Sequence, residues 1–294
     1  MYFILRTFLL AGSALCIFWS VIKIVDYKKK IDYLFTPLNF KITIFILILS
    51  VAILVTFLVS PNIFSRFTLE DGPIEWGTYF CFLGAAIIFF IILLSIKKFN
   101  NNQHLKIICL LLFLFFFISS MEEVSWFQRT LNIETPQLFE QNEQHELNFH
   151  NFHTNFFEVL FYFFSFFFLI VCPFLKYMGY FENQPIFNFF VPNLETALIA
   201  VAFVPYNFDM WNIPTSQISV FFSIFFLLYF YKKQKTIALL LIYIIIAQVI
   251  YLSINRYQRS WEITEYKEFF ISLTFFYYSL NVFLQFKRNN LVLL

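Results

Sequence analysis

Residues 107–121 read IICLLLFLFFFISSM, a run of fifteen residues without a charged side chain. A helix needs roughly 20 predominantly apolar residues to cross the hydrocarbon core of a bilayer, which is about 30 Å thick. With the residues that follow it, this run forms one of nine predicted spans. They are 2–25, 42–60, 75–96, 107–126, 156–178, 193–209, 217–232, 236–254 and 268–286.

The composition of the whole chain agrees with this prediction. Of its 294 residues, 60% are hydrophobic, 13% are charged and 48 are Phe. Soluble domains are typically about 45–50% apolar and about 25% charged. We therefore expect an all-α fold, a polytopic transmembrane helical bundle formed by one integral membrane domain over 1–294. A soluble globule, a nucleic-acid binder and a disulfide scaffold are excluded, and the span 2–25 is interpreted as a retained anchor.

The short loops predict the orientation of the chain. Lys and Arg gather in alternate loops, which become cytoplasmic if nine spans alternate. The N-terminus is then outside and the C-terminus cytoplasmic. Spans 193–209 and 217–232 are interrupted by Pro205 and Pro214, so it is left open whether they cross fully.

Acidic residues gather at the predicted outer ends of the spans, which insertion alone does not explain. Asp71 and Glu75, before and in the first turn of span 75–96, are four residues apart and share a helix face. Two such carboxylates repel unless a cation or a proton lies between them. The alternative is that they only complement the helix dipole.

The end of span 107–126 carries a second polar group. Glu122 and Glu123 lie at the helix C-terminus, where carboxylates oppose the dipole. A continuous helix would place Glu122, Ser125, Trp126 and Arg129 on one face. The alternative interpretation is that Glu122 simply pairs with Arg129.

The outer loop 129–155 is expected to contain a short interfacial helix. If the loop is helical, Glu146, His150 and His153 form one stripe at i, i+4 and i+7. A carboxylate and two imidazoles are a reasonable ligand set for a divalent metal, zinc or manganese. Polar interfacial helices also carry His without a metal, so this alternative stays open.

Two further segments reach the same predicted face, one around Asp209 and one over 255–265. Arg256 and Arg259, like Arg129, violate the positive-inside rule. They have a reason to lie outside if they pair with carboxylates or hold an anionic headgroup or phosphate. Glu262 and Glu265 follow them.

Three motifs resemble a group of uncharacterised bacterial polytopic membrane proteins. They are EDGxxEW at 70–76, EExSWxQR at 122–129 and NxQxExNxHN at 142–151, followed by the pair Glu262 and Glu265. The resemblance implies a multi-pass protein of the bacterial plasma membrane but no activity. In that group a Gly stands where this chain has Phe127.

The leading hypothesis is a membrane-embedded enzyme with a site at the outer leaflet, acting by hydrolysis or group transfer on a lipid or lipid-linked substrate. Its catalytic candidates are carboxylates, with Glu122 or Glu123 as general base; they are Asp71, Glu75, Glu122, Glu123, Glu262 and Glu265. The substrate would contact Trp126, Arg129, Asp209, Arg256 and Arg259. A metal held by Glu146, His150 and His153 would activate water.

Two other functions stay open. A transporter or channel would place its site near the bilayer midplane on broken helices, as the Pro-interrupted spans allow. A non-catalytic envelope scaffold would use the acidic face and its Trp residues to bind another protein.

Overall fold

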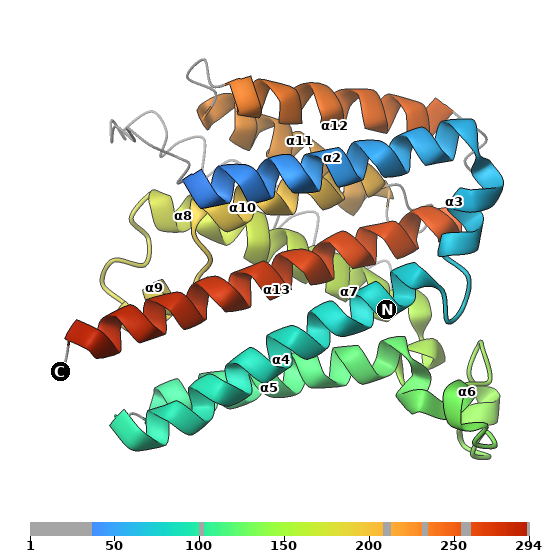
Figure 1. Cartoon of the computed structure of the whole chain (residues 1–294), viewed down its shortest axis with the longest axis horizontal. Coiled ribbons are helices and arrows are strands. Elements are labelled where there is room, and N and C mark those ends of the chain that lie inside the picture. The colour runs from blue at the N-terminus through green and yellow to red at the C-terminus, as the bar shows by residue number, and fades with distance from the viewer. Residues whose placement is uncertain (1–36, 100–102, 208–212, 231–234, 254–259, 293–294) are drawn as a thin grey trace. The chain divides into compact units, whose positions relative to one another are not determined.

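The computed structural model describes residues 37–99, 103–207, 213–230, 235–253 and 260–292. Every regular element in these ranges is a helix, and none of them contains a strand (Figure 1). The all-α prediction is therefore confirmed for the part of the chain that is described. The predicted span 2–25 lies outside the described residues.

Five helices are long and apolar enough to cross a membrane, and each overlaps a predicted span. They are Phe40–Val59, Pro73–Ile96, Gln103–Glu123, Thr154–Tyr177 and Trp261–Arg288. Three shorter apolar helices, Leu194–Tyr206, Ser216–Phe230 and Lys235–Tyr251, coincide with three further predictions. The chain is thus a helical protein with several membrane-compatible helices. The count of nine spans and the orientation of the termini stay predictions.

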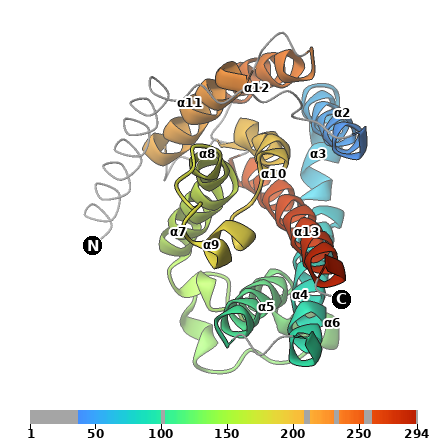
Figure 2. The ribbon, with the colours of Figure 1, turned by 90° about the vertical axis from the view of Figure 1, so that its left-hand side faces the viewer.

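The chain divides into two compact units, and the single integral membrane domain expected over 1–294 stays a prediction. In the first unit, α12 lies beside α2, and α10 lies beside α8 (Figure 2). α12 also contacts η5. Its helices are α2 (Pro37–Val59), α3 (Pro61–Phe67), most of α7 (Thr154–Phe166), π-helical η4 (Phe167–Val171), α8 (Cys172–Tyr177), α9 (Pro185–Phe190), α10 (Leu194–Ala200), η5 (Val201–Tyr206), α11 (Ile213–Phe230), α12 (Lys235–Ser253) and the start of α13 (Ser260–Val292).

The second unit is built on the antiparallel pair α4 and α5, which lie side by side (Figure 1). The ring of Phe116 on α5 stacks between Phe82 and Phe89 of α4, with ring centres 6.2 and 5.7 Å apart. The unit comprises α4 (Pro73–Phe99), α5 (Gln103–Glu123), η1 (Ser125–Phe127), α6 (Gln128–Leu131), η2 (Phe139–Gln141), η3 (His150–Phe152) and α13 from residue 271.

Two features of this unit are compatible with a lipid environment: a small residue where helices pack closely, and large apolar side chains on the exposed surface. The ring of Phe276 on α13 packs closely on Gly84 of α4. A Cβ atom added to Gly84 would lie only 2.7 Å from a carbon of this ring. Small residues allow such close approach of membrane helices. On the outside of the pair, Phe80 and Leu111 are 60% and 59% exposed. In lipid, exposed side chains of this kind carry no penalty from water.

Candidate functional site at the ends of α4 and α5

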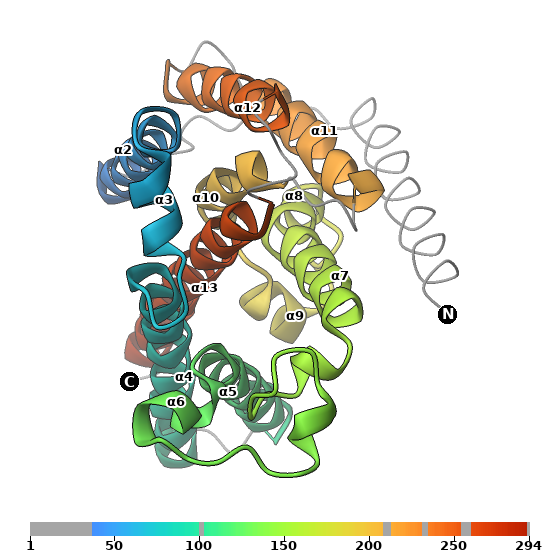
Figure 3. The same ribbon diagram turned by 90° about the vertical axis from the view of Figure 1, so that its right-hand side faces the viewer.

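The start of α4 and the end of α5 lie at the same end of the hairpin, and the segment 124–153 folds over it (Figure 3). α4 begins at Pro73, which suits the first helical turn because its missing N–H would be unpaired there. α5 ends at Glu123. The residues of all three predicted motifs, 70–76, 122–129 and 142–151, meet in this one unit.

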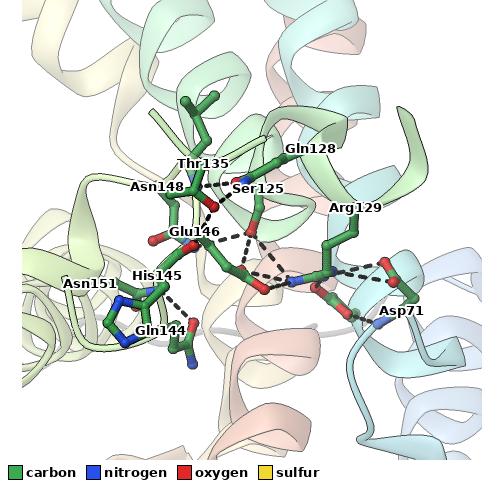
Figure 4. Close-up of polar contacts among 12 residues, drawn as sticks. Asp71, Ser125, Gln128, Arg129, Thr135, Gln144, His145, Glu146, Asn148 and Asn151 are labelled. Atoms are coloured by element: carbon green, nitrogen blue, oxygen red, sulfur yellow. Dashed lines mark hydrogen bonds and ion pairs between the residues drawn. The ribbon is translucent and has the colours of Figure 1, made fainter. Parts of the chain in front are cut away.

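Arg129 is the centre of the polar contacts (Figure 4). Its Nε and Nη2 donate to the carboxylate of Asp71 at 3.2 and 3.3 Å. Its Nη2 also donates to Glu75. Its Nη1 donates to both carboxylate oxygens of Glu146, at 2.7 and 2.8 Å. One guanidinium therefore joins three segments that are far apart in the sequence.

The cation that the spacing of Asp71 and Glu75 requires is Arg129. The side chains of Glu75 and Glu146 are each 12% exposed, and that of Arg129 is 20% exposed. Burial alone lowers the pKa of Arg129, but the hydrogen bonds to Glu146 and Asp71 and the charges of Glu75 and Glu146 raise it above its ordinary value. The sequence predicted that arginines at this end of the spans either pair with carboxylates or hold an anionic group. Arg129 pairs with carboxylates.

The chain between α5 and α6 turns through three successive left-handed residues. Ser125, Trp126 and Phe127 have φ angles of 45°, 54° and 61°. This region is sterically unfavourable for residues other than Gly. The expected continuous helix face of Glu122, Ser125, Trp126 and Arg129 is therefore wrong, because the helix ends before Ser125.

Neighbouring contacts hold this turn in place. The hydroxyl of Ser125, which is buried, donates to Glu146 at 2.5 Å and accepts from Asn148 at 3.2 Å. The ring of Phe127 packs edge-on against Tyr79 of α4, with centres 5.7 Å apart. Backbone strain of this kind persists only where the surroundings fix it.

Two buried amide side chains, those of Asn142 and Gln128, hold the segment 142–148 in place. Asn142 donates to the backbone oxygens of Glu146 and Asn148, at 2.6 and 3.2 Å. Gln128 accepts from the backbone N–H of Leu147 and donates to Thr135 at 2.6 Å. The backbone of Glu146 is therefore fixed independently of its carboxylate.

Glu122 lies in a second contact group beside the first. One carboxylate oxygen accepts from the indole N–H of Trp126 at 2.8 Å. The other accepts from the backbone N–H groups of Phe149 and His150, at 2.6 and 3.2 Å. The same oxygen lies 3.3 Å from Nδ1 of His150. Glu122 therefore pairs with His150, and the alternative pairing of Glu122 with Arg129 is not the one that the structure shows.

The helical stripe predicted for a metal is not formed. Over 142–153 the only helix in the structure is the short η3, so Glu146, His150 and His153 do not follow helical spacing. Glu146 contacts Arg129 and Ser125, His150 contacts Glu122, and the side chain of His153 is exposed. Among the described residues, no group of three His, Cys, Asp or Glu side chains is arranged to hold a metal ion. The zinc or manganese site does not fit this arrangement.

Of the remaining predicted site residues, Glu262 and Glu265 belong to the other unit. Glu262 and Glu265 lie in the first turns of α13. Asp209, Arg256 and Arg259 lie outside the described residues. The shared pocket expected from all five segments stays a prediction. Glu123 lies at the last residue of α5.

Sequence reasoning missed two sets of residues. Gln128, Thr135 and Asn148 hold the loop, and the density of amides over 142–151 was the available signal. The second is Lys267, which is fully buried on α13 with Nζ 3.2 Å from the centre of the Tyr162 ring. Ile263 and Ile271, four residues to either side, would have placed Lys267 on an apolar face.

Comparison with known proteins adds no assignment, since no family model, no curated protein and no solved structure matches the chain. The resemblance of the three motifs to an uncharacterised bacterial group therefore stays a prediction.

Proposed function

We propose that this protein is an integral membrane enzyme of the bacterial plasma membrane, in which His150 is a general base oriented by Glu122. The substrate is a lipid or lipid-linked molecule, and the reaction is hydrolysis or group transfer. The observation that supports the proposal is the Glu122–His150 pair, with Nδ1 of the imidazole 3.3 Å from the carboxylate. A carboxylate in this position orients an imidazole and stabilises its charged form as it takes up a proton.

The two members of the pair differ in exposure, and this divides their roles. The side chain of His150 is 39% exposed, whereas that of Glu122 is 12% exposed. Glu122 accepts hydrogen bonds from Trp126, Phe149 and His150, so its lone pairs are engaged. We therefore assign Glu122 as a positioning residue and His150 as the base, in place of Glu122 or Glu123 as base.

The proton balance of the proposed step is simple. With Nδ1 directed to Glu122, Nε2 of His150 has no partner in the part of the chain that the structure describes. Nε2 takes a proton from water or from an acceptor hydroxyl as its oxygen attacks the substrate. The leaving group then receives that proton, so the histidine returns to its neutral form.

Arg129 has an organising role in this proposal. Its donors are engaged by Asp71, Glu75 and Glu146, which ties the loop of His150 to the start of α4. The anionic part of a substrate would then be bound by Arg256 and Arg259, which lie outside the described residues. Trp126 and Asp209 complete the proposed substrate contacts.

The proposed substrate class follows from the position of the pair. Glu122 lies at the end of a helix long and apolar enough to span a membrane, Gln103–Glu123. His150 on the following loop is therefore within reach of lipid headgroups. With nine spans, the N-terminus outside and the C-terminus cytoplasmic, this end of α5 is at the outer surface.

The proposal is tested with purified protein in nanodiscs made from native lipid extract, followed by mass spectrometry of the lipids. We expect time-dependent headgroup loss or transfer that falls by about 10²–10⁴-fold in His150→Gln, the range for removal of a general base. His153→Gln is the matched control, because His153 is an exposed histidine of the same loop with no side-chain contact among the described residues.

Equal turnover in wild type and His150→Gln would contradict the role of His150. No lipid product from wild type, with the protein folded by circular dichroism, would contradict the enzyme proposal as a whole. The scaffold hypothesis would then be favoured.

A further inference from the structure

The segment between α5 and α7 exposes two large apolar side chains beside a buried aromatic ring. Leu138 and Phe149 are 67% and 56% exposed, whereas Phe139 is buried. Leu138 precedes Phe139 in the chain, and the ring of Phe149 packs edge-on against that of Phe139, with centres 5.2 Å apart. We call Leu138 and Phe149 the exposed apolar pair.

Backbone hydrogen bonds hold the chain at both members of this pair. The N–H of Phe139, next to Leu138, donates to the carbonyl oxygen of Pro136 at 2.7 Å, and the N–H of Phe149 donates to Glu122 at 2.6 Å. The two exposed side chains therefore belong to a fixed part of the fold. Transfer of such side chains from water to an apolar phase is favourable, so the position of the pair decides what covers it.

Glu122 sets that position. It lies in the last turn of Gln103–Glu123, a helix long and apolar enough to cross a membrane. Its carboxylate accepts from the backbone of Phe149 and from the indole N–H of Trp126. Trp is enriched at the level where headgroups meet acyl chains. Phe149 is thus held at the end of a membrane-length helix, at the level of the membrane surface.

The other end of the segment is tied to the same level. After η3 the chain enters Thr154–Tyr177, a second helix of membrane-spanning length and composition. The segment lies across the end of the α4–α5 hairpin between these two helices (Figure 3). Lipid is therefore the apolar phase within reach of the exposed apolar pair.

We propose that Leu138 and Phe149 insert into lipid at the boundary between headgroups and acyl chains, and so hold this segment on the membrane surface. Interfacial elements bury their apolar side chains about 5–10 Å deep at this boundary. The proposal rests on the proposed membrane location of the protein and is independent of catalysis by His150.

The charges of the segment indicate the class of lipid. Residues 130–149 contain no Lys or Arg, and Glu134, Glu140 and Glu143 are exposed. Carboxylates at the membrane surface are repelled by anionic headgroups. The lipid that fits this surface is therefore zwitterionic.

Photolabelling of the wild-type full-length protein in phosphatidylcholine vesicles tests this surface. The probe is a phosphatidylcholine that carries a diazirine at the start of one acyl chain, and peptide mass spectrometry locates the labelled residues. We expect label on Leu138 and Phe149 at about ten-fold or more the yield at Glu143, because burial of one large apolar side chain favours the inserted state by at least this ratio. Glu143 is the matched control, since it is an exposed polar residue of the same segment. Ile118, an exposed residue near the end of α5, is the positive control for lipid contact.

A second set of vesicles tests the lipid class. Replacement of half of the phosphatidylcholine by phosphatidylglycerol at low salt is expected to lower the yield on the exposed apolar pair by about two-fold or more. An unchanged or higher yield would overturn the preference for zwitterionic lipid.

The pattern of label separates failure of this proposal from failure of the membrane location. Label on Ile118 without excess label on Leu138 and Phe149 over Glu143 overturns the insertion and favours a protein partner for this surface, while the membrane location stands. Absence of label from Ile118 as well overturns both.

Discussion

Arg129 binds both carboxylate oxygens of Glu146 through a single guanidinium nitrogen, at 2.7 and 2.8 Å, across 17 residues of sequence. Its other nitrogens reach Asp71 and Glu75 at the start of α4. The conformation of the loop and the position of α4 are thus coupled through one side chain. Removing that side chain leaves three acidic groups close together without their cation.

Arg129→Met is therefore expected to lower the free energy of unfolding by about 2–4 kcal/mol, because loss of one member of a largely buried ion pair leaves its partners uncompensated. The measurement is thermal unfolding of the detergent-solubilised protein. Arg66→Met is the control, since Arg66 is exposed and forms no ion pair within the described residues. Equal destabilisation by the two changes would show that the contacts of Arg129 contribute nothing specific.

The stability that Arg129 contributes is expected to be constant over neutral and alkaline pH. Its pKa is raised in the folded protein. A raised pKa stabilises the fold fully below the pKa of the unfolded chain, which lies far above neutral pH, and this contribution is lost only as pH rises through the folded value. The difference in unfolding temperature between wild type and Arg129→Met should thus be equal at about pH 7 and about pH 10. A decline over that interval would contradict the assignment.

Phe127→Gly is expected to be more stable than Phe127→Ala by about 1 kcal/mol or more. Both changes remove the ring that packs on Tyr79, but only Gly adopts the φ of 61° without steric cost. Comparing the two variants isolates the backbone contribution. Equal unfolding temperatures would argue against the left-handed conformation at this residue.

Glu122→Ala is expected to release the segment 142–153. The change leaves the indole of Trp126 and the backbone N–H groups of Phe149 and His150 without their acceptor. Since each of these hydrogen bonds contributes about 1 kcal/mol, limited proteolysis of this segment should accelerate by about ten-fold. Glu143→Ala, at an exposed residue of the same loop, should leave the rate unchanged. Cleavage at the wild-type rate in Glu122→Ala would contradict the contacts described.

Gly84→Ala is expected to destabilise the packing of α4 on α13 by about 1 kcal/mol, because the added methyl group meets the ring of Phe276. The double variant Gly84→Ala with Phe276→Leu should recover part of this loss. Thermal unfolding measures both. Additive effects of the two changes would indicate that the residues are not in contact.

The hydrophobic runs predicted most of the helices, because span length and apolar content depend only on local composition. α4 and α5 begin and end within a few residues of their predicted bounds. The site could be predicted only as a set of residue types. The spacing of Asp71 and Glu75 indicated a cation or a proton between them, but nothing local identified Arg129, 58 residues away from Asp71.

Predictions that assumed helical spacing beyond Glu123 and within the loop 142–153 were wrong for a physical reason. Buried contacts around Ser125 override the local preference of the chain and end α5 at Glu123. The same holds for Glu146 and His150, whose segment is fixed by amide contacts from Asn142 rather than by a helix. Such long-range contacts leave no periodic signal in the sequence.

The three left-handed residues after α5 also set a strict limit on chain length. The left-handed turn between α5 and α6 consists of Ser125, Trp126 and Phe127, and Arg129 follows two residues later. One inserted or deleted amino acid here would rotate the guanidinium away from all three acids at once. Evolutionary change in this link should therefore occur by substitution, while gaps accumulate in the exposed stretch near Glu134.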